Sequence, residues 1–558
     1  MTAVLKGFVD VPHGQVHFRY GGRGPVVVML HDSPRSSVLH VPNIEWLGDH
    51  FTVIALDTPG YGNSTPLPHA APEIPDFAAA LAATLDALGI ERCALYGFRG
   101  GSKIALQFAA DHPERAALTI LDGLALPPRP ASPDDLQQYL LPFEPVADGS
   151  HLVQQWSTVL DFHRWFPWFA RSAATRMALA LPGDLDLHEY AADLFMAGRH
   201  WTSAYGAALR HLAAPNIPRL RSRTVFMCRE DDVLYGFLDA LPQSLPSSCS
   251  VERIPPQTPA WRTRLLDLLR HADLPRSEWR PPAAAAPGDA HGERQSYVDL
   301  VHGQVRVRRR GRDGVPLLML HDVPGGSCAL RPLDEVLGRD RLTIAPDLPG
   351  LGESHPLPYP SLGSYVTALT ELLEALGCST VDVFAEGLGT CFAVALAAHH
   401  PQLVRRLALD ALPMVRSRDR RVYARHYCPP LVPDRHGTHL LEIWQQMRDA
   451  EASWPWFDRS AAAARKHDPD LDPERLQANL VEIVKQLPSY GDAARAALEA
   501  AVRDILKGVR QPVLLLDDAG DVRYAGARRA ARHLADARTQ PRPAAPAARA
   551  RMLQEYFA

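Results

Sequence analysis

The sequence predicts an α/β protein made of two tandem domains, each a mostly parallel sheet flanked by helices and carrying a helical insertion. Three observations lead to this prediction. The chain of 558 residues repeats its own motifs in its second half. Within each copy, short apolar runs alternate with segments of helical periodicity, which favours a parallel sheet covered on both faces. A stretch rich in proline and alanine separates the two copies.

The repeat runs along both copies with a nearly constant offset. The segment MLHDSP at Met29–Pro34 returns as MLHDVP at Met319–Pro324, which is 290 positions later (319 − 29). The segment DTPGYGNS at Asp57–Ser64 returns as DLPGLGES at Asp347–Ser354, again 290 positions later (347 − 57). Because the offset spans a whole domain, the pattern indicates domain duplication and not a solenoid of short units.

The boundary between the copies lies in the segment SEWRPPAAAAPGD, which begins at Ser277. Its prolines interrupt any helix, and its composition is typical of an interdomain linker. The sequence therefore predicts one domain at 1–275, a linker at 276–292 and a second domain at 293–558.

The elements of the sheet follow from local patterns. Residues 25–30 and 51–56 are almost wholly apolar, as expected of strands buried on both faces. Residues 77–88 have helical spacing and end before Gly89, a natural helix stop. Strands are expected again at 223–228 and, in the second copy, at 512–516. Between strands, about 127–215 is helix-like, punctuated by proline and rich in aromatic residues, which predicts a helical cap; the corresponding cap of the second copy is expected at about 415–500.

Composition excludes several classes of protein. Lys+Arg 59 against Asp+Glu 63 gives a net charge of −4, with no basic cluster of the kind that nucleic-acid binding needs. The 7 cysteines have no framework spacing and form no C-x-x-C pair, which indicates a reducing compartment and no structural zinc. No signal peptide or membrane-spanning run is visible, so a cytoplasmic protein without membrane contact is expected.

One stretch carries the strongest functional signal. The apolar run at Cys93–Tyr96 leads into Gly97, Phe98 and Arg99, and a helical pattern follows from Lys103. This is the strand–turn–helix context in which G-x-S-x-G presents a nucleophilic serine. The serine position is Arg99 here, and the second copy has Gly387 at the matching place.

On these residues each copy resembles an α/β-hydrolase-fold domain of the capped type. The resemblance rests on the HDSP and HDVP turns, the DxPGxGxS turns, the elbow glycines and the Asp231–Asp232 turn after a late strand. The first turn is similar to the H-G-x-P turn of epoxide hydrolases and dehalogenases, with aspartate in place of glycine. The resemblance implies the fold for most of the chain, but the fold hosts many chemistries and some proteins without activity.

The same resemblance implies a catalytic triad, and its members are expected to be incomplete. Arg99 and Gly387 cannot act as the covalent nucleophile of the triad, because that role needs an activated oxygen or sulfur. Ser102 is expected to be an ordinary first-turn residue of the following helix. The acid is retained as Asp232 (or Asp231) and as Asp521. The loops after the last strand of each copy contain no histidine.

Backbone amides of an oxyanion hole do not depend on side chains. The amides of Gly100 and Leu388 can converge with amides near Ser33 and Val323, which predicts a donor-lined pocket beneath each cap. Arg99 is expected either to bind an anion or to plug the pocket as an ion-pair partner, and Glu386 is its acidic counterpart or an exposed turn residue.

Other polar positions occur in both copies. Each has a structural alternative. Asp32 and Asp322 can form Asx-type turns. His151 and His439 can pack in the first turn of a cap helix. Arg171 and Arg459 can form salt bridges within the cap. Asp57 and Asp347 are expected to brace their glycine turns. The candidate acid–base residues are Asp32, Asp322, His151, His439, Asp232 and Asp521. The candidate binding residues are His31, Ser33, Arg99, Gly100, His321, Val323, Glu386, Gly387, Leu388, Arg171 and Arg459.

Two functions remain open at this point. One is an enzyme that acts on a small carbonyl or carboxylate compound without a triad, by proton transfer, lyase, isomerase-like or atypical hydrolytic chemistry. The other is a pseudo-hydrolase that binds a ligand or serves as a scaffold; a conventional serine hydrolase is third. The sequence shows no fingerprint for a metal, nucleotide or flavin, so we expect no cofactor, and we expect the two copies to pack on each other.

Overall fold

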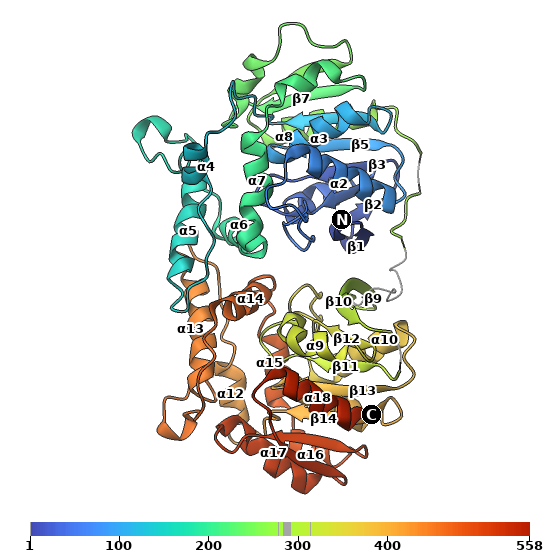
Figure 1. Ribbon diagram of the computed structural model, residues 1–558, viewed down its shortest axis with the longest axis vertical. Coiled ribbons are helices and arrows are strands. Elements are labelled where there is room, and N and C mark those ends of the chain that lie inside the picture. The colour runs from blue at the N-terminus through green and yellow to red at the C-terminus, as the bar shows by residue number, and fades with distance from the viewer. Residues whose placement is uncertain (1, 277, 283–291, 313) are drawn as a thin grey trace. The chain divides into compact units, whose positions relative to one another are not determined.

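The computed structural model describes residues 2–276, 278–282, 292–312 and 314–558. The chain divides into two compact units (Figure 1). The first contains Met1–Glu144 and Val153–Ala284, and the second contains Pro145–Leu152 and Ala285–Ala558. Residues 277 and 283–291 of the predicted linker lie outside the described residues.

The first unit contains an eight-stranded sheet in the order β1-β2-β4-β3-β5-β6-β7-β8. β2 is antiparallel to both β1 and β4, whereas the pairs from β4 to β8 are parallel. The strands are β1 Leu5–Val11, β2 Gly14–Gly22, β3 Val26–Leu30, β4 Thr52–Leu56, β5 Cys93–Phe98, β6 Ala116–Asp122, β7 Thr224–Arg229 and β8 Cys249–Ile254.

Helices follow most of the parallel strands. The helices of the sheet domain are α1 Val41–Leu47, α2 Ile74–Ala87, α3 Gly100–Asp111 and α8 Thr258–Arg270. The predicted cap contains α4 Pro133–Tyr139, α5 Ser150–Phe162, α6 Asp184–Ala197 and α7 Trp201–Arg210. α2 starts before the predicted residue 77, because Glu73 and Asp76 form a capping box ahead of the apolar positions.

The core of the first unit shows why the strands read as continuous apolar runs. Alternate residues of the central strands, such as Val27 and Met29, pack with Leu47 of α1 and with Leu265 and Leu268 of α8. Because successive strand residues point to opposite faces, α1 and α8 cover one face of the sheet. Every residue of β3 and of β4 is buried, so both faces of these strands are covered, as predicted.

The second unit repeats this architecture, with strand order β16-β15-β14-β13-β11-β12-β10-β9. Its strands are β9 Arg294–Leu300, β10 Gly303–Arg310, β11 Leu317–Leu320, β12 Thr343–Pro346, β13 Val381–Glu386, β14 Val404–Asp410, β15 Val513–Asp517 and β16 Ala537–Pro541. Its helices are α9 Arg331–Leu337, α10 Leu362–Ala375, α11 Gly389–His399, α12 Arg420–His426, α13 Thr438–Ala452, α14 Pro473–Val484, α15 Asp492–Glu499, α16 Val502–Leu506, α17 Ala525–Ala530 and α18 Pro546–Phe557. The predicted tandem pair of mostly parallel sheets is confirmed. In the described ranges, no helix combines the length and apolarity needed to cross a membrane.

Candidate functional site

The sharp turn between β5 and α3 keeps the backbone of a nucleophile elbow although its apex is arginine. Arg99 has φ 44° and ψ −105°, a conformation that L-residues rarely adopt. The turn needs glycine beside it, because a Cβ on Gly101 would lie 2.6 Å from the backbone oxygen of Leu30. Gly387, the apex in the second unit, has φ 51°. Both copies therefore retain the positive-φ turn, which is strained at Arg99 and relaxed at Gly387.

In the first unit the two amides of the expected oxyanion hole already have an acceptor. The backbone N–H groups of Ser33 and Gly100 both donate to Oδ1 of Asp32, at 2.7 and 3.3 Å. Burial raises the pKa of Asp32 above its ordinary value, an effect that Arg99 and the two amides partly offset. The aspartate that stands in place of the glycine of H-G-x-P thus accepts from both amides that were predicted to form an oxyanion hole.

The second unit has the same arrangement, with a shorter hydrogen bond from the amide after the apex. Oδ1 of Asp322 accepts from the amides of Val323 and Leu388, each at 2.8 Å. A Cβ on Gly387 would lie 2.0 Å from Cγ of Asp322, so the carboxylate fills the space that a nucleophile side chain would need. Burial raises the pKa of Asp322, partly offset by the same two amides. In this unit, therefore, the position of Asp322 leaves no room for a side chain at the apex.

Arg99 lies between two carboxylates. Its Nη2 is 3.0 Å and its Nε 3.2 Å from Oδ2 of Asp232, and its Nη1 is 3.4 Å from Oδ2 of Asp32. Asp232 also accepts from the amide of Leu234 at 2.8 Å. The guanidinium therefore contacts the acid that a triad histidine would contact, and it joins this acid to the occupied amide pair.

The corresponding acid of the second unit is neutralised differently. Oδ2 of Asp521 is 2.9 Å from Nη2 of Arg465 and 3.0 Å from Nε of Arg523. Against the upward effect of burial, these guanidinium groups hold the pKa of Asp521 below its ordinary value. Glu386, next to the apex, pairs with Arg549 at 3.3 Å. The two units keep the acid position but surround it with different cations.

His31 and His321, the histidines of the HDSP and HDVP turns, fix the backbone of the site through hydrogen bonds. His31 Nε2 accepts from the amide of Thr58 at 2.9 Å, and its Nδ1 lies 2.7 Å from the backbone oxygen of Asp32. His321 makes the same pair of contacts with Leu348 and Asp322, at 3.1 and 2.7 Å. Because one nitrogen accepts, the other must donate, which fixes a neutral tautomer. These buried rings connect the Asp turn to the glycine-rich turn.

The cap histidines His151 and His439 make their contacts within the second unit. His151 belongs to the second unit, where its Nδ1 accepts from the amide of Val146 at 3.1 Å and its Nε2 is 2.9 Å from Oε1 of Gln477. Burial lowers the pKa of His151. His439 is buried at the start of α13, with Nδ1 3.9 Å from Oδ2 of Asp434. In both cases the surroundings are those of a packed first-turn histidine.

The two cap arginines differ in their surroundings. Arg171 pairs with Asp161 at 2.7 Å, and about half of its side chain is exposed. Arg459 is exposed in the second unit. Arg171 does not line the cavity of the first unit described below. Ser102 donates its hydroxyl to the backbone oxygen of Arg99 at 2.5 Å, which confirms its expected role as a first-turn residue.

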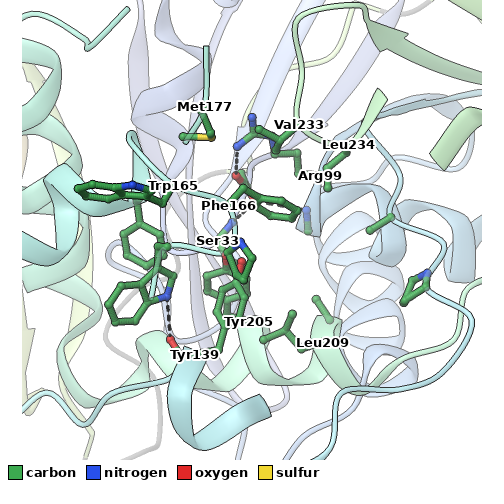
Figure 2. A pocket seen from close by; sticks show the side chains of 18 of the residues that line it. Ser33, Arg99, Tyr139, Trp165, Phe166, Met177, Tyr205, Leu209, Val233 and Leu234 are labelled. Atoms are coloured by element: carbon green, nitrogen blue, oxygen red, sulfur yellow. Dashed lines mark hydrogen bonds and ion pairs between the residues drawn. The ribbon is translucent and has the colours of Figure 1, made fainter. Parts of the chain in front are cut away.

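A cavity of about 810 Å³ lies above the elbow of the first unit. Asp32, Ser33, Arg99 and Gly100 line this cavity and contact one another, forming its polar end. Ser33 and Arg99 are labelled in Figure 2. The walls of the cavity are aromatic and come mainly from the cap: Tyr139, Phe162, Trp165, Phe166, Tyr190 and Tyr205. Such a shape, apolar around a few convergent polar groups, is typical of a small-molecule site.

Sequence reasoning noticed the aromatic cap but missed several residues of this cavity. Tyr139, Tyr190 and Tyr205 lie on three separate helices, with no spacing that joins them. Lys103 lines the cavity as well, although in the sequence it is an unremarked residue of the helix after the elbow. The sequence did offer one signal for Lys103. It stands near the start of the helix that follows the elbow, and the cap covers that end of the helix.

The comparisons with known proteins agree with this architecture. A family model described as the alpha/beta hydrolase fold matches residues 25–194 and 315–427. An acetyltransferase component of the acetoin cleaving system from Cupriavidus necator is 34% identical over 115 residues, 20% of this chain and 30% of that protein. A fluoroacetate dehalogenase from Burkholderia is 30% identical over 129 residues, 21% of this chain and 42% of that protein. The chain thus spans less than half the length of these two relatives.

Longer matches have lower identity. A pimeloyl-[acyl-carrier protein] methyl ester esterase from Aeromonas hydrophila is 24% identical over 220 residues, 36% of this chain and 84% of that protein. Among solved structures, an epoxide hydrolase from an endophytic Streptomyces is 20% identical with a TM-score of 0.39, covering 48% of this chain and 97% of that one. The family model matches segments of both copies, and the chain belongs to the α/β-hydrolase-fold family.

Proposed function

We propose that the first unit binds a small, largely apolar organic molecule in its aromatic cavity and forms no acyl-enzyme. The observation that carries this proposal is the occupation of both oxyanion-hole amides by Asp32, below an apex that is arginine. Acyl transfer needs a nucleophile and donors free to receive the developing oxyanion. The cavity remains large enough for a ligand although these two requirements are not met.

The polar end of the cavity favours a neutral oxygen on the ligand. Arg99, of which 33% of the side chain is exposed, pairs with Asp32, which lines the cavity, and with Asp232 behind it, which does not. A carbonyl or hydroxyl oxygen can accept from this guanidinium without adding charge. A further carboxylate would meet two anions at close range, which is unfavourable in a partly buried site. The proposal therefore names an aromatic or alicyclic compound with a carbonyl or hydroxyl group.

A second candidate function is proton transfer by Asp32 on the bound compound. The raised pKa of its carboxyl group supports this alternative, because general acids and bases work best when their pKa lies nearer to neutral pH. The variant Asp32→Asn keeps an oxygen for the two amides but cannot exchange a proton. Turnover of a ligand by the wild type that vanishes in Asp32→Asn would favour this candidate over binding alone.

The cavity is tested by filling it. Leu209, which lines the cavity on α7, is replaced by tryptophan, and binding of the neutral dye Nile red is followed by its emission. We expect the affinity to fall about tenfold, equivalent to about 1.4 kcal/mol. Leu185→Trp is the matched control, because Leu185 is 65% exposed on α6. Equal binding by both variants and the wild type would place the dye outside this cavity.

The absence of acyl transfer is tested with a serine-reactive fluorophosphonate. We expect no stoichiometric label on the wild-type protein. We also expect none on Arg99→Ser, because Asp32 still occupies the two amides that would stabilise the oxyanion. Intact-protein mass spectrometry measures both, with an active serine hydrolase as the positive control. A full label on either protein would contradict the proposed function.

A further inference from the structure

Lys103 is a buried amine in the wall of the cavity. It lies on α3, and its side chain is 4% exposed. Its Nζ donates to the backbone oxygens of Ala208 at 2.7 Å and His211 at 3.0 Å. Among the described residues no carboxylate forms an ion pair with it, which is unusual for a lysine so deeply buried.

The hydrogen bonds of Lys103 suit an uncharged amine. An ammonium group has three donors, and the structure offers two acceptors, both of them backbone oxygens. A neutral amine has two N–H donors, which these two oxygens satisfy, and one free lone pair. Burial also lowers the pKa of Lys103 to about 8. His211 is no competing cation near neutral pH, because burial and Lys103 lower its pKa to about 4.

The neighbours of this amine are those of the proposed ligand site. Lys103 and Ala208 line the same cavity as Arg99 and the aromatic cap residues. A desolvated lysine in an apolar pocket is the setting in which an amine becomes a nucleophile toward carbonyl compounds. Arg99 at the polar end supplies a donor that can polarise a carbonyl oxygen.

From this arrangement we infer that Lys103 forms a reversible imine with an aldehyde or ketone ligand held in the cavity of the first unit. The lone pair of Nζ attacks the carbonyl carbon, and the carbon–oxygen π electrons move to the oxygen. The two protons of the amine and the carbonyl oxygen leave together as water, and a carbon–nitrogen double bond remains. The inference rests on the proposed function, because it requires that the cavity binds an organic carbonyl compound.

The inference is tested by reductive trapping on the full-length protein. 2-Naphthaldehyde and cyanoborohydride are added at about pH 7.5, and tryptic peptides are mapped by mass spectrometry. The chain has only five lysines, so assignment is direct. Lys507, which is exposed and paired with Asp504, is the matched control. We expect labelling of Lys103 at least about tenfold above Lys507, because burial lowers the pKa of Lys103 and leaves more of its amine uncharged and nucleophilic at this pH.

Binding without reaction is measured separately, with 2-naphthalenemethanol, which cannot form an imine. We expect the alcohol to bind the wild type, while trapping of the aldehyde is lost in Lys103→Met and Lys103→Arg. If the alcohol binds the wild type and Lys103 is not labelled above Lys507, the inference is overturned and the proposed function stands. If neither compound binds, both are overturned. The wild-type labelling decides the question even where a variant fails to fold.

Discussion

Replacing Asp57 by alanine is expected to lower the free energy of unfolding of the first unit by about 3–5 kcal/mol, because it leaves buried polar groups without their partner. The carboxylate of Asp57 is fully buried and accepts from Nδ1 of His17 at 2.7 Å and from the amides of Ser37 at 2.7 Å and Asn63 at 2.9 Å. These contacts confirm that the aspartate braces its glycine turn. Hydrogen exchange of peptides from β3 and β4 measures the loss in this unit alone.

The effect of Asp57 should depend on pH in a defined direction. Against the upward effect of burial, His17 holds the pKa of Asp57 well below its ordinary value. A depressed carboxyl pKa contributes stability above the unfolded value, about 3.9, and that contribution is lost as the pH falls through the folded value. The difference between wild type and Asp57→Ala should therefore shrink below about pH 4. Asp273→Ala, at a side chain that is 95% exposed, is the control and should change little.

Asp57→Ala should also weaken the binding of a ligand in the cavity. The amide of Thr58, next to Asp57, donates to His31, and His31 contacts the backbone oxygen of Asp32. Loosening the turn removes the support of the residue that occupies the oxyanion-hole amides. Weaker Nile red binding should accompany the lost stability. A variant as stable as the wild type would show that these hydrogen bonds are replaced by others.

The fold was predictable because its signals are local and occur twice. The apolar run at 25–30 became β3, and the pattern of glycine and aspartate at 57–64 had a copy 290 positions later (347 − 57). The start of α2 was misplaced because Glu73 and Asp76 cap the helix through side-chain hydrogen bonds, which apolar periodicity does not report. Because the two copies differ in sequence, each of them predicted the same fold independently.

The candidate site was predictable only in part. Motifs placed Arg99 at the elbow and Asp32 in the first turn, but the joint occupation of the amides depends on a contact across 68 positions, between Asp32 and Gly100. Lys103 was missed for the same reason. The partners of its buried amine are the backbone oxygens of Ala208 and His211, which lie 105 and 108 positions away in the sequence. Side-chain direction and long-range partners are set by tertiary packing, which a single sequence does not contain.

Replacing Arg99 by methionine is expected to destabilise the first unit by about 2 kcal/mol at pH 8. The loss is smaller than for a fully buried pair, because 33% of the Arg99 side chain is exposed. The variant leaves the carboxylates of Asp32 and Asp232, 17% and 11% exposed, without the cation between them. Arg99 lowers the pKa of Asp32, so its removal raises that pKa further above the ordinary value.

The sign of the pH dependence separates this loss from a loss of packing. A carboxyl group with a raised folded pKa lowers stability as the pH rises from its unfolded value through its folded value. The deficit of Arg99→Met should therefore be larger at pH 8 than at about pH 5, because a falling pH favours the protonated form of Asp32. Adding Asp32→Asn removes one of the two charges and should restore about half of the deficit at pH 8. Hydrogen exchange of β5 and α3 peptides measures each variant. A deficit that is equal at both pH values would mean that the methionine disturbs packing, and that Arg99 does not act by neutralising the two aspartates.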